Sequence, residues 1–221
     1  MPLTPFFMLL LSGLLVFLFV LIQVDVLSFA FVKLGLSPRT GMLVLFGSLL
    51  GSAVNIPLFT LQAEEGALPP SELPRRFVHL RDLVGRFDGR TVVAVNLGGC
   101  VIPVGVSLYL LQIHQLPLLS LMLGIAGVAA ASYASSRPIP GMGIGMPLFI
   151  APVVSVLLAL MLYPQSAAPL AYISGTLGVL IGADLLRLRT ITRLGAPVAS
   201  IGGAGTFDGI FFTGVLAALL A

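Results

Sequence analysis

Charge is scarce in this chain, and its scarcity excludes most soluble folds. Only 9% of the 221 residues are Asp, Glu, Lys or Arg, whereas 58% are hydrophobic. The mean hydropathy is +1.13, and these values together lie far outside the range of a soluble globular domain. The sequence therefore predicts a polytopic protein of the lipid bilayer, which we expect to be a prokaryotic cytoplasmic membrane.

Cysteine is nearly absent as well. Cys100 is the only one, and this excludes an intrachain disulfide and a cysteine-based metal site. His79 lies alone among arginines, where a surface residue is more common than a ligand, so we expect no metal and no cofactor. The net charge of +3 does not predict nucleic-acid binding, because the arginines gather in a few connecting segments instead of covering one face.

The N-terminus lacks the positively charged region and the cleavage motif of a secretory signal peptide, so we expect it to be retained as a first span. Apolar runs of about 20 residues are long enough to cross a bilayer. They predict an all-α transmembrane bundle of about seven spans, forming a single domain over residues 1–221. The predicted spans are Phe6–Phe31, Gly41–Leu61, Thr91–Leu111, Pro117–Ser132, Pro147–Leu162, Leu170–Leu186 and some part of Ala196–Ala221.

The basic residues predict the orientation of this bundle. With seven crossings, most arginines fall on one side, and only Lys33 and Arg39 fall on the other. By the positive-inside rule the arginine-rich side is cytoplasmic, which places the N-terminus inside and the C-terminus outside. The arginines of the cytoplasmic side are Arg75, Arg76, Arg81, Arg86, Arg90, Arg137, Arg187, Arg189 and Arg193.

A polar segment at residues 62–90 carries most of the charge. Its arginines are nearly balanced by Asp and Glu residues, which is typical of a solvated cytoplasmic loop. The string RRFVHLRDLVGRF interleaves apolar and basic residues, so the alternative is an element that lies on an anionic leaflet.

Two pairs of similar strings suggest an internal repeat. GSLLG and GVLIG are both GxxxG patterns, which allow helix backbones to approach closely, and each is followed within one turn by Asn55 or Asp184. VAVNLGG from Val93 resembles VASIGG from Val198 with one residue deleted. The alternative is chance similarity in a chain rich in small apolar residues. If the repeat is real, it is a parallel one, and Asn55 and Asn96 are then candidates to line a shared cavity.

Asp184 and Asp208 lie in otherwise apolar, Gly-rich sequence. A charged side chain at the centre of a bilayer costs roughly 2.5 to 3.5 kcal/mol on insertion scales, so acids placed there are functional candidates. In a continuous helix from Ala196, Asp208 would lie about 18 Å along the axis, too deep to meet Asp184 beside the cytoplasmic edge. The two carboxylates can pair only if the last segment is interrupted.

The string GGAG at Gly202–Gly205 predicts that interruption, because glycine costs roughly 1 kcal/mol relative to alanine inside a helix. A helix that starts near Thr206 would place Asp208 in its first turn, where negative charge is stabilised. We therefore predict a cavity open to the cytoplasm that contains both aspartates. The supporting loop would comprise Gly202, Gly203, Gly205 and Thr206.

Three functions are consistent with these residues. A carboxylate pair that shares one proton can activate water, which predicts an aspartyl hydrolase with catalytic Asp184 and Asp208 acting on a membrane-protein substrate. Broken helices, buried acids and the two asparagines also fit an ion- or proton-coupled transporter that carries a cation. In the third, the aspartates only bind Arg187, Arg189 or backbone amides and hold helices together, and the protein is a non-catalytic scaffold or handles lipid. The oligomeric state is left open.

Two family resemblances accompany these hypotheses. Gly205 and Asp208 match the Gly-x-Gly-Asp motif of the intramembrane aspartyl proteases, namely presenilin, signal peptide peptidase and prepilin peptidase, and Asp184 matches their first aspartate. This resemblance implies peptide hydrolysis inside the membrane. The strings NIPL, VAVNLGGCVIP, SRPIPG and GGAGTFDGIFFTG are similar to an uncharacterised family of bacterial and archaeal membrane proteins. That resemblance implies a membrane location and no particular activity.

Overall fold

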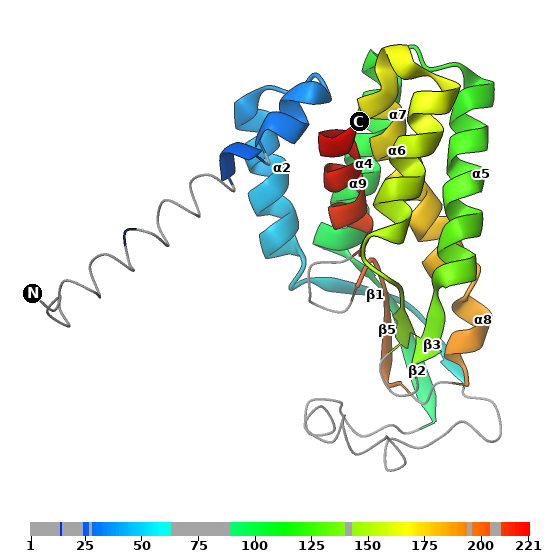
Figure 1. Ribbon diagram of the computed structural model, residues 1–221. Coiled ribbons are helices and arrows are strands. Elements are labelled where there is room, and N and C mark those ends of the chain that lie inside the picture. Colours follow the sequence, from blue (N-terminus) through cyan, green and yellow to red (C-terminus); the bar gives the residue numbers. More distant parts are fainter. Residues whose placement is uncertain are drawn as a thin grey trace, which may run out of the picture.

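The computed structural model describes residues 14, 24–26, 28–62, 89–139, 143–193, 196–203 and 209–221. Upright helices stand on a small sheet, and the C-terminus lies at the end of the bundle opposite that sheet (Figure 1). The helices are α2 (Pro38–Gly51), η3 (Leu97–Val101), α4 (Ile102–Ile113), α5 (Leu118–Ser135), α6 (Ile150–Leu162), η4 (Pro164–Ser166), α7 (Ala167–Val179), η5 (Leu180–Leu185), α8 (Leu188–Ile191) and α9 (Gly209–Leu220). The strands are β1 (Asn55–Gln62), β2 (Arg90–Asn96), β3 (Arg137–Ile139), β4 (Gly143–Gly145) and β5 (Val198–Ile201).

The strands correct the predicted all-α fold. β1 pairs antiparallel with β2, from Asn55 opposite Asn96 to Gln62 opposite Arg90, and β2 pairs in parallel with β5. A separate hairpin joins β3 to β4. The molecule is therefore mostly helical, with a three-stranded sheet in the order β1-β2-β5 at one end of its bundle.

Three predicted spans are part helix and part strand. The span Gly41–Leu61 contains most of α2 and most of β1, Thr91–Leu111 contains β2 from its second residue, and Ala196–Ala221 contains β5. Hydropathy does not separate a short apolar strand from a buried helix segment. The β-branched residues of RTVVAVN and VASI favour strands, and Pro57 in β1 lies at an irregularity of the ladder, on an edge strand.

The structure does not support the predicted count of seven spans. Among the described residues, two helices are long and apolar enough to cross a membrane, Leu118–Ser135 and Pro164–Leu185. They correspond to the predicted spans Pro117–Ser132 and Leu170–Leu186. A third span results if Val24–Lys33 and α2 count as one broken crossing, with a bend of 116° between them. The apolar helices Leu97–Ile113 and Ile150–Leu162 are shorter.

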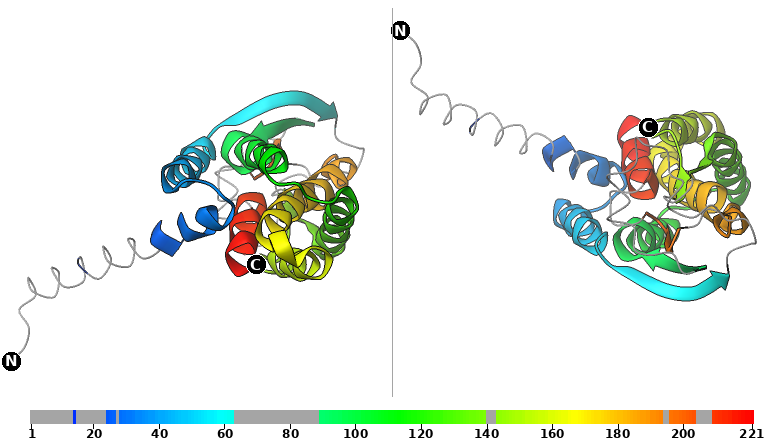
Figure 2. Two further views of the ribbon diagram at one scale, coloured as in Figure 1. Left: turned by 90° about the horizontal axis from the view of Figure 1, so that it is seen from above. Right: turned by 90° about the horizontal axis from the view of Figure 1, so that it is seen from below.

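Small residues bring α5 and α7 close together. A Cβ at Gly182 would collide with the carbonyl oxygen of Ala129, and one at Gly178 would lie 2.6 Å from the Cβ of Val128. GVLIG thus makes the close helix contact that a GxxxG pattern allows. Seen from above and below in Figure 2, α9 lies beside α7 within the bundle.

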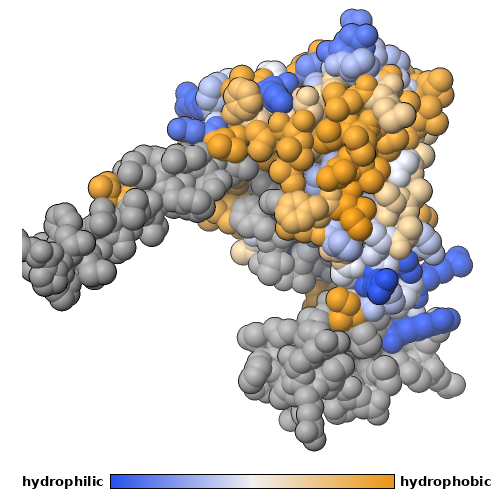
Figure 3. Space-filling view, in the orientation of Figure 1, coloured by the Kyte–Doolittle hydropathy of each residue, from blue (hydrophilic) through white to orange (hydrophobic). Residues whose placement is uncertain are grey.

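On the face shown in Figure 3, the coloured surface of the bundle is mainly apolar along its side and polar toward both ends. Met122 on α5 is 59% exposed, and Leu157 and Met161 on α6 are 56% and 80% exposed. An exposed apolar surface that extends over several helices needs a partner other than water. The distribution of hydropathy matches a bundle whose sides face lipid.

The described basic residues separate between the two ends. Lys33 lies at the end away from the sheet, where its Nζ donates to the carbonyl oxygen of Leu219 near the end of α9, at 3.0 Å. Arg39 lies in the first turn of α2, at the same end. The described arginines of the sheet end are Arg90, Arg137, Arg187, Arg189 and Arg193. Of the polar segment 62–90, Gln62 and Arg90 pair as strand residues, and residues 63–88 lie outside the described chain.

Candidate functional site

The similar strings VAVNLGG and VASIGG lie side by side as parallel strands. Val93 pairs with Ala199 and Val95 with Ile201. Each strand leads through a pair of glycines toward a helix, β2 through η3 to α4, and β5 through Gly202 and Gly203 toward α9. The resemblance therefore corresponds to two parallel strand–glycine–helix units in contact.

Gly202 is the point where the two units touch. Its φ is +84°, a conformation that glycine adopts readily and other residues avoid. A Cβ there would lie 2.6 Å from the Cβ of Cys100 and 2.8 Å from the carbonyl carbon of Gly99. Both backbone conformation and space thus require glycine at this position.

The last predicted span is interrupted at these glycines. β5 ends at Ile201, Gly203 has a φ of +90°, and α9 begins at Gly209. The interruption agrees with the expectation for GGAG, although a strand and not a helix precedes it. Gly205, Thr206 and Asp208 lie outside the described residues, so the pairing of Asp208 with Asp184 stays a prediction.

Asp184 reaches the interrupted segment from a neighbouring helix. Its Oδ2 accepts a hydrogen bond from the Gly202 amide at 3.0 Å. The residue is half-buried in η5, a π-helical end to α7 in which the Leu186 amide donates to the Ile181 carbonyl at 2.9 Å. Such π-turns are rare and often occur at functional sites. The carboxylate thus holds the turn that leads from β5 toward α9.

Asn96 ends β2 one position beyond the pair formed by Val95 and Ile201, next to this turn. It is fully buried, and its Oδ1 caps η3 by accepting from the Gly99 amide at 2.7 Å. Its Nδ2 donates to the Ser52 carbonyl at 2.7 Å and to Asn55 Oδ1 at 3.1 Å. Asn96 therefore fixes both the start of η3 and the position of Asn55.

The two asparagines meet each other and a serine that sequence reasoning missed. Asn55 is exposed, and its Oδ1 also accepts from Ser200 Oγ at 2.5 Å. Ser200 lies in β5, two residues before Gly202, so the second unit contributes to the same polar cluster. The sequence VASI was predicted as part of a helical span, so its strand alternation was not used to place the Ser200 side chain.

Arg187 has a structural role close to the site. Its Nη2 donates to the carbonyl oxygens of Tyr133 at 2.7 Å and Ser136 at 3.1 Å, and its Nε donates to Ser136 Oγ at 3.2 Å. The guanidinium also lies 4.1 Å from the centre of the Tyr133 ring. A cation at the last carbonyls of a helix is favourable, so Arg187 caps the end of α5.

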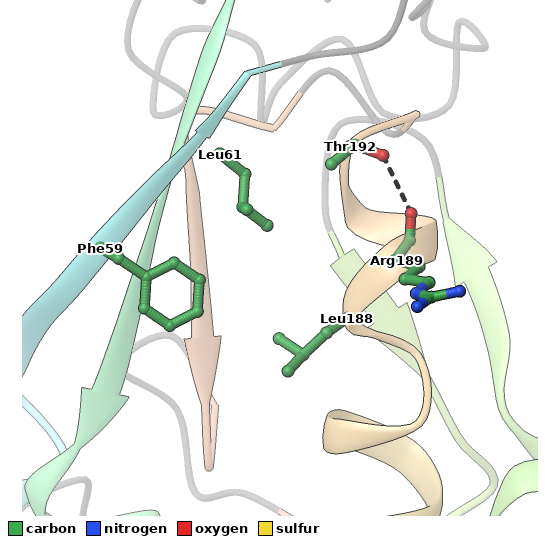
Figure 4. A pocket seen from close by; sticks show the side chains of 5 residues that line it. All are labelled: Phe59, Leu61, Leu188, Arg189 and Thr192. Atoms are coloured by element: carbon green, nitrogen blue, oxygen red, sulfur yellow. Dashed lines mark hydrogen bonds between the residues drawn. The ribbon is translucent and has the colours of Figure 1, made fainter.

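A groove opens between β1 and α8, beside the site (Figure 4). Its volume is about 280 Å³, and it is lined by Phe59 and Leu61 from β1 and by Leu188, Arg189 and Thr192 from the α8 side. Leu188 points across the groove toward β1, whereas the guanidinium of Arg189 extends away from it. The groove is thus mainly apolar, and its Leu61 and Leu188 pack against the apolar cluster that contains Val93, Cys100 and Ile201.

A family model described as "Protein of unknown function (DUF1614)" matches residues 49–220. The chain belongs to this family. No curated protein and no solved structure shows a significant match. The comparisons thus support the resemblance to an uncharacterised family. They give no support to the resemblance to intramembrane aspartyl proteases.

The family match covers the whole described site. It starts in α2, includes Asn55, Asn96, Asp184 and Ser200, and ends within α9. The helical residues before α2 lie outside it. The polar cluster and the Asp184 contact therefore belong to the part of the chain that the family has in common.

Proposed function

We propose that this member of the DUF1614 family is an integral membrane protein with its sheet end in the cytoplasm, its N-terminus inside and its C-terminus outside. Support comes from the exposed apolar sides of the bundle and from the arginines at the sheet end. The proposed crossings are about seven, as in the sequence-based prediction. The shorter helices cross as broken segments, since non-helical backbone is tolerated at membrane depth where protein or a wet cavity surrounds it.

We further propose that the protein is an ion- or proton-coupled transporter whose site is the junction of the two strand–glycine–helix units. The observation that carries this proposal is the hydrogen bond from the Gly202 amide to Asp184 Oδ2. It joins an ionisable side chain at the end of one helix to the glycine turn that follows β5, and the cluster of Asn55, Asn96 and Ser200 lies in the strands of the same sheet. Discontinuous segments related by a repeat, with an acid between them, are what a coupled carrier needs.

The chemistry of this hydrogen bond suggests how protonation is coupled to conformation. An ionised carboxylate accepts a charge-assisted hydrogen bond, roughly twice as strong as a neutral one. Protonation of Asp184 weakens its hold on the Gly202 turn, and α9 follows that turn. A proton or cation that binds Asp184 more tightly in one position of α9 than in the other then changes the equilibrium between the two positions. Such a difference in affinity is what coupling requires.

Proton and sodium flux into proteoliposomes tests the proposal. A potassium gradient with valinomycin sets the membrane potential, an entrapped pH dye reports protons, and labelled sodium reports the metal ion. We expect vesicles with the wild-type protein to take up one of the two ions faster than protein-free vesicles. In vesicles with Asp184→Asn, the flux of that ion should fall at least tenfold. Asp25→Asn is the matched control, because Asp25 is exposed and outside the site. Wild-type vesicles that carry neither ion would contradict the proposal.

A second candidate function is an aspartyl hydrolase formed by Asp184 and Asp208. It is favoured by the same contact, because Asp184 binds the start of the segment that leads to Asp208. The test is cleavage of a model membrane substrate by the purified protein and by Asp184→Asn and Asp208→Asn. Loss of cleavage in both variants would favour the hydrolase, and equal cleavage by all three would exclude it. Absence of both flux and cleavage would favour the scaffold.

A further inference from the structure

Three hydroxyl groups on facing helices are buried with no hydrogen bond to the backbone or to another element in the described part of the chain. They belong to Tyr172 and Thr176 on α7 and to Thr213 on α9. Within α7, the Tyr172 hydroxyl has the Thr176 hydroxyl as its neighbour. All three residues have no exposed surface. An unsatisfied hydroxyl in a buried position costs about 1 to 3 kcal/mol, so a helix contact that buries three hydroxyls, with no bond between them except that of Tyr172 with Thr176, needs an explanation.

The three residues lie along the seam where α9 packs on α7. A Cβ at Gly214 of α9 would lie 2.6 Å from Thr176 Oγ1 and 3.0 Å from the Tyr172 ring. A Cβ at Gly175 of α7 would lie 3.1 Å from the methyl group of Thr213. The glycines thus allow the two backbones to approach with the hydroxyl-bearing residues between them.

The π-turn of η5 places Asp184 on the same side of α7 as this seam. In a regular helix of about 100° per residue, Asp184 would be rotated by about 80° from Thr176, eight residues earlier. The π-turn takes up one additional residue, so that only seven residues contribute about 100° each to the rotation. Asp184 then lies within about 20° of Thr176 around the helix axis. The contact between Asp184 and Gly202 on the segment leading to α9 agrees with this geometry.

We propose that Tyr172, Thr176 and Thr213 form the path along which a proton travels between Asp184 and the far end of the bundle. This inference rests on the proposed transport function and identifies the coupled ion as a proton. Each hydroxyl donates one hydrogen bond and accepts others, so it passes on its own proton as it receives the next and keeps no net charge. From Asp184 to Tyr172 the path rises about 18 Å, most of the height of α7 and η5.

The tight packing of the seam favours a proton over a metal ion. A metal cation such as calcium needs several oxygen ligands at short distances, whereas the glycine contacts leave no such space around Thr176 Oγ1. Water molecules that enter when α9 moves would connect the hydroxyls to one another and, as a short file, span about 12 Å of helix axis between Thr176 and Asp184, since a buried water needs only two to four polar partners. The hydrogen bond between Asp184 and the Gly202 amide then controls when α9 moves away from α7.

Isosteric removal of the hydroxyls tests the path. Tyr172→Phe, Thr176→Val and Thr213→Val keep the shape of each side chain, and Tyr109→Phe and Thr60→Val are exposed controls. We expect proton flux in the proteoliposome assay to fall at least tenfold in each of the three variants, with an unchanged or higher Tm. The controls should keep the wild-type flux. Thr176→Ser, which restores a hydroxyl, should recover at least half of it.

The outcomes separate this inference from the proposed function. Wild-type proton flux in all three variants, together with its loss in Asp184→Asn, would overturn the path and leave the transporter standing. Sodium flux without proton flux would likewise overturn the path alone. A fall in flux that tracks a fall in Tm, without recovery in Thr176→Ser, would show a packing role and also contradict the path. Wild-type vesicles that carry no ion would remove both proposals.

Discussion

The Asp184 carboxylate accepts a hydrogen bond from the Gly202 amide at 3.0 Å, across 18 residues of sequence. One partner ends a long apolar helix in a π-turn, and the other begins the interruption of the last segment. Gly202 in turn packs on Gly99 and Cys100 of the first strand–glycine–helix unit. A single acid thereby contacts the place where the two units meet.

Gly202→Ala should destabilise the protein by about 2 to 4 kcal/mol, because a left-handed backbone and an overpacked contact each add to the cost. Gly105→Ala is the matched control, since its Cβ would meet nothing within 4 Å and alanine favours the helix. Thermal unfolding in detergent measures both. A Tm for Gly202→Ala equal to that of the control would mean that the two units do not touch as described.

Asn96→Ala should cost about 2 kcal/mol, since it removes a helix cap and leaves a buried amide of Gly99 without its acceptor. Asn55→Ala should cost less than about 1 kcal/mol, because Asn55 is exposed. Chemical denaturation of the two variants under one set of conditions gives the difference. Equal losses would contradict the central position of Asn96 in the cluster.

Arg187→Gln should lower the stability by about 1 to 2 kcal/mol, because the side chain caps α5 and lies over the Tyr133 ring. Arg189→Gln removes the same charge from the next turn and should stay within about 0.5 kcal/mol of the wild type. Comparison of the two Tm values separates the specific contacts from net charge. A larger effect for Arg189 would reverse our assignment of these roles.

Cysteine labelling should locate the two ends of the bundle. In a Cys100→Ser background, Arg39→Cys at the end away from the sheet should react with a membrane-impermeant maleimide in intact cells. Arg189→Cys at the sheet end should react only after the cells are opened. The positive-inside rule predicts this result, and labelling in the opposite order would invert the proposed orientation.

Helical content, two long spans and the interruption at Gly202 were predictable, because each depends on a strong local signal. The apolar runs of α5 and α7 are longer than a strand, and the glycines of GGAG disfavour a helix. Asn55 and Asn96 were candidates to line one cavity if the repeat was real. The structure joins them by a hydrogen bond, and the cavity and their role stay predictions.

The strands and π-turns were not predictable from hydropathy. β1, β2 and β5 are short apolar runs whose strand character depends on pairing with segments far along the chain. The π-turn of η5 has no strong sequence signal of its own, yet it decides which way Asp184 points. The count of seven spans stays a prediction, because length and hydropathy do not report where a helix ends, and two described helices are long and apolar enough to cross a membrane.

Hydrogen exchange at the Gly202 turn tests the central claim most directly. The peptide covering residues 198–203 is followed by mass spectrometry in the wild type and in Asp184→Asn, a neutral mimic of the protonated acid. We predict exchange about tenfold faster in the variant, corresponding to about 1.4 kcal/mol for the lost charge-assisted component, with unchanged protection in α5. Equal protection of the 198–203 peptide in both proteins would show that Asp184 does not control the turn, and would contradict the account.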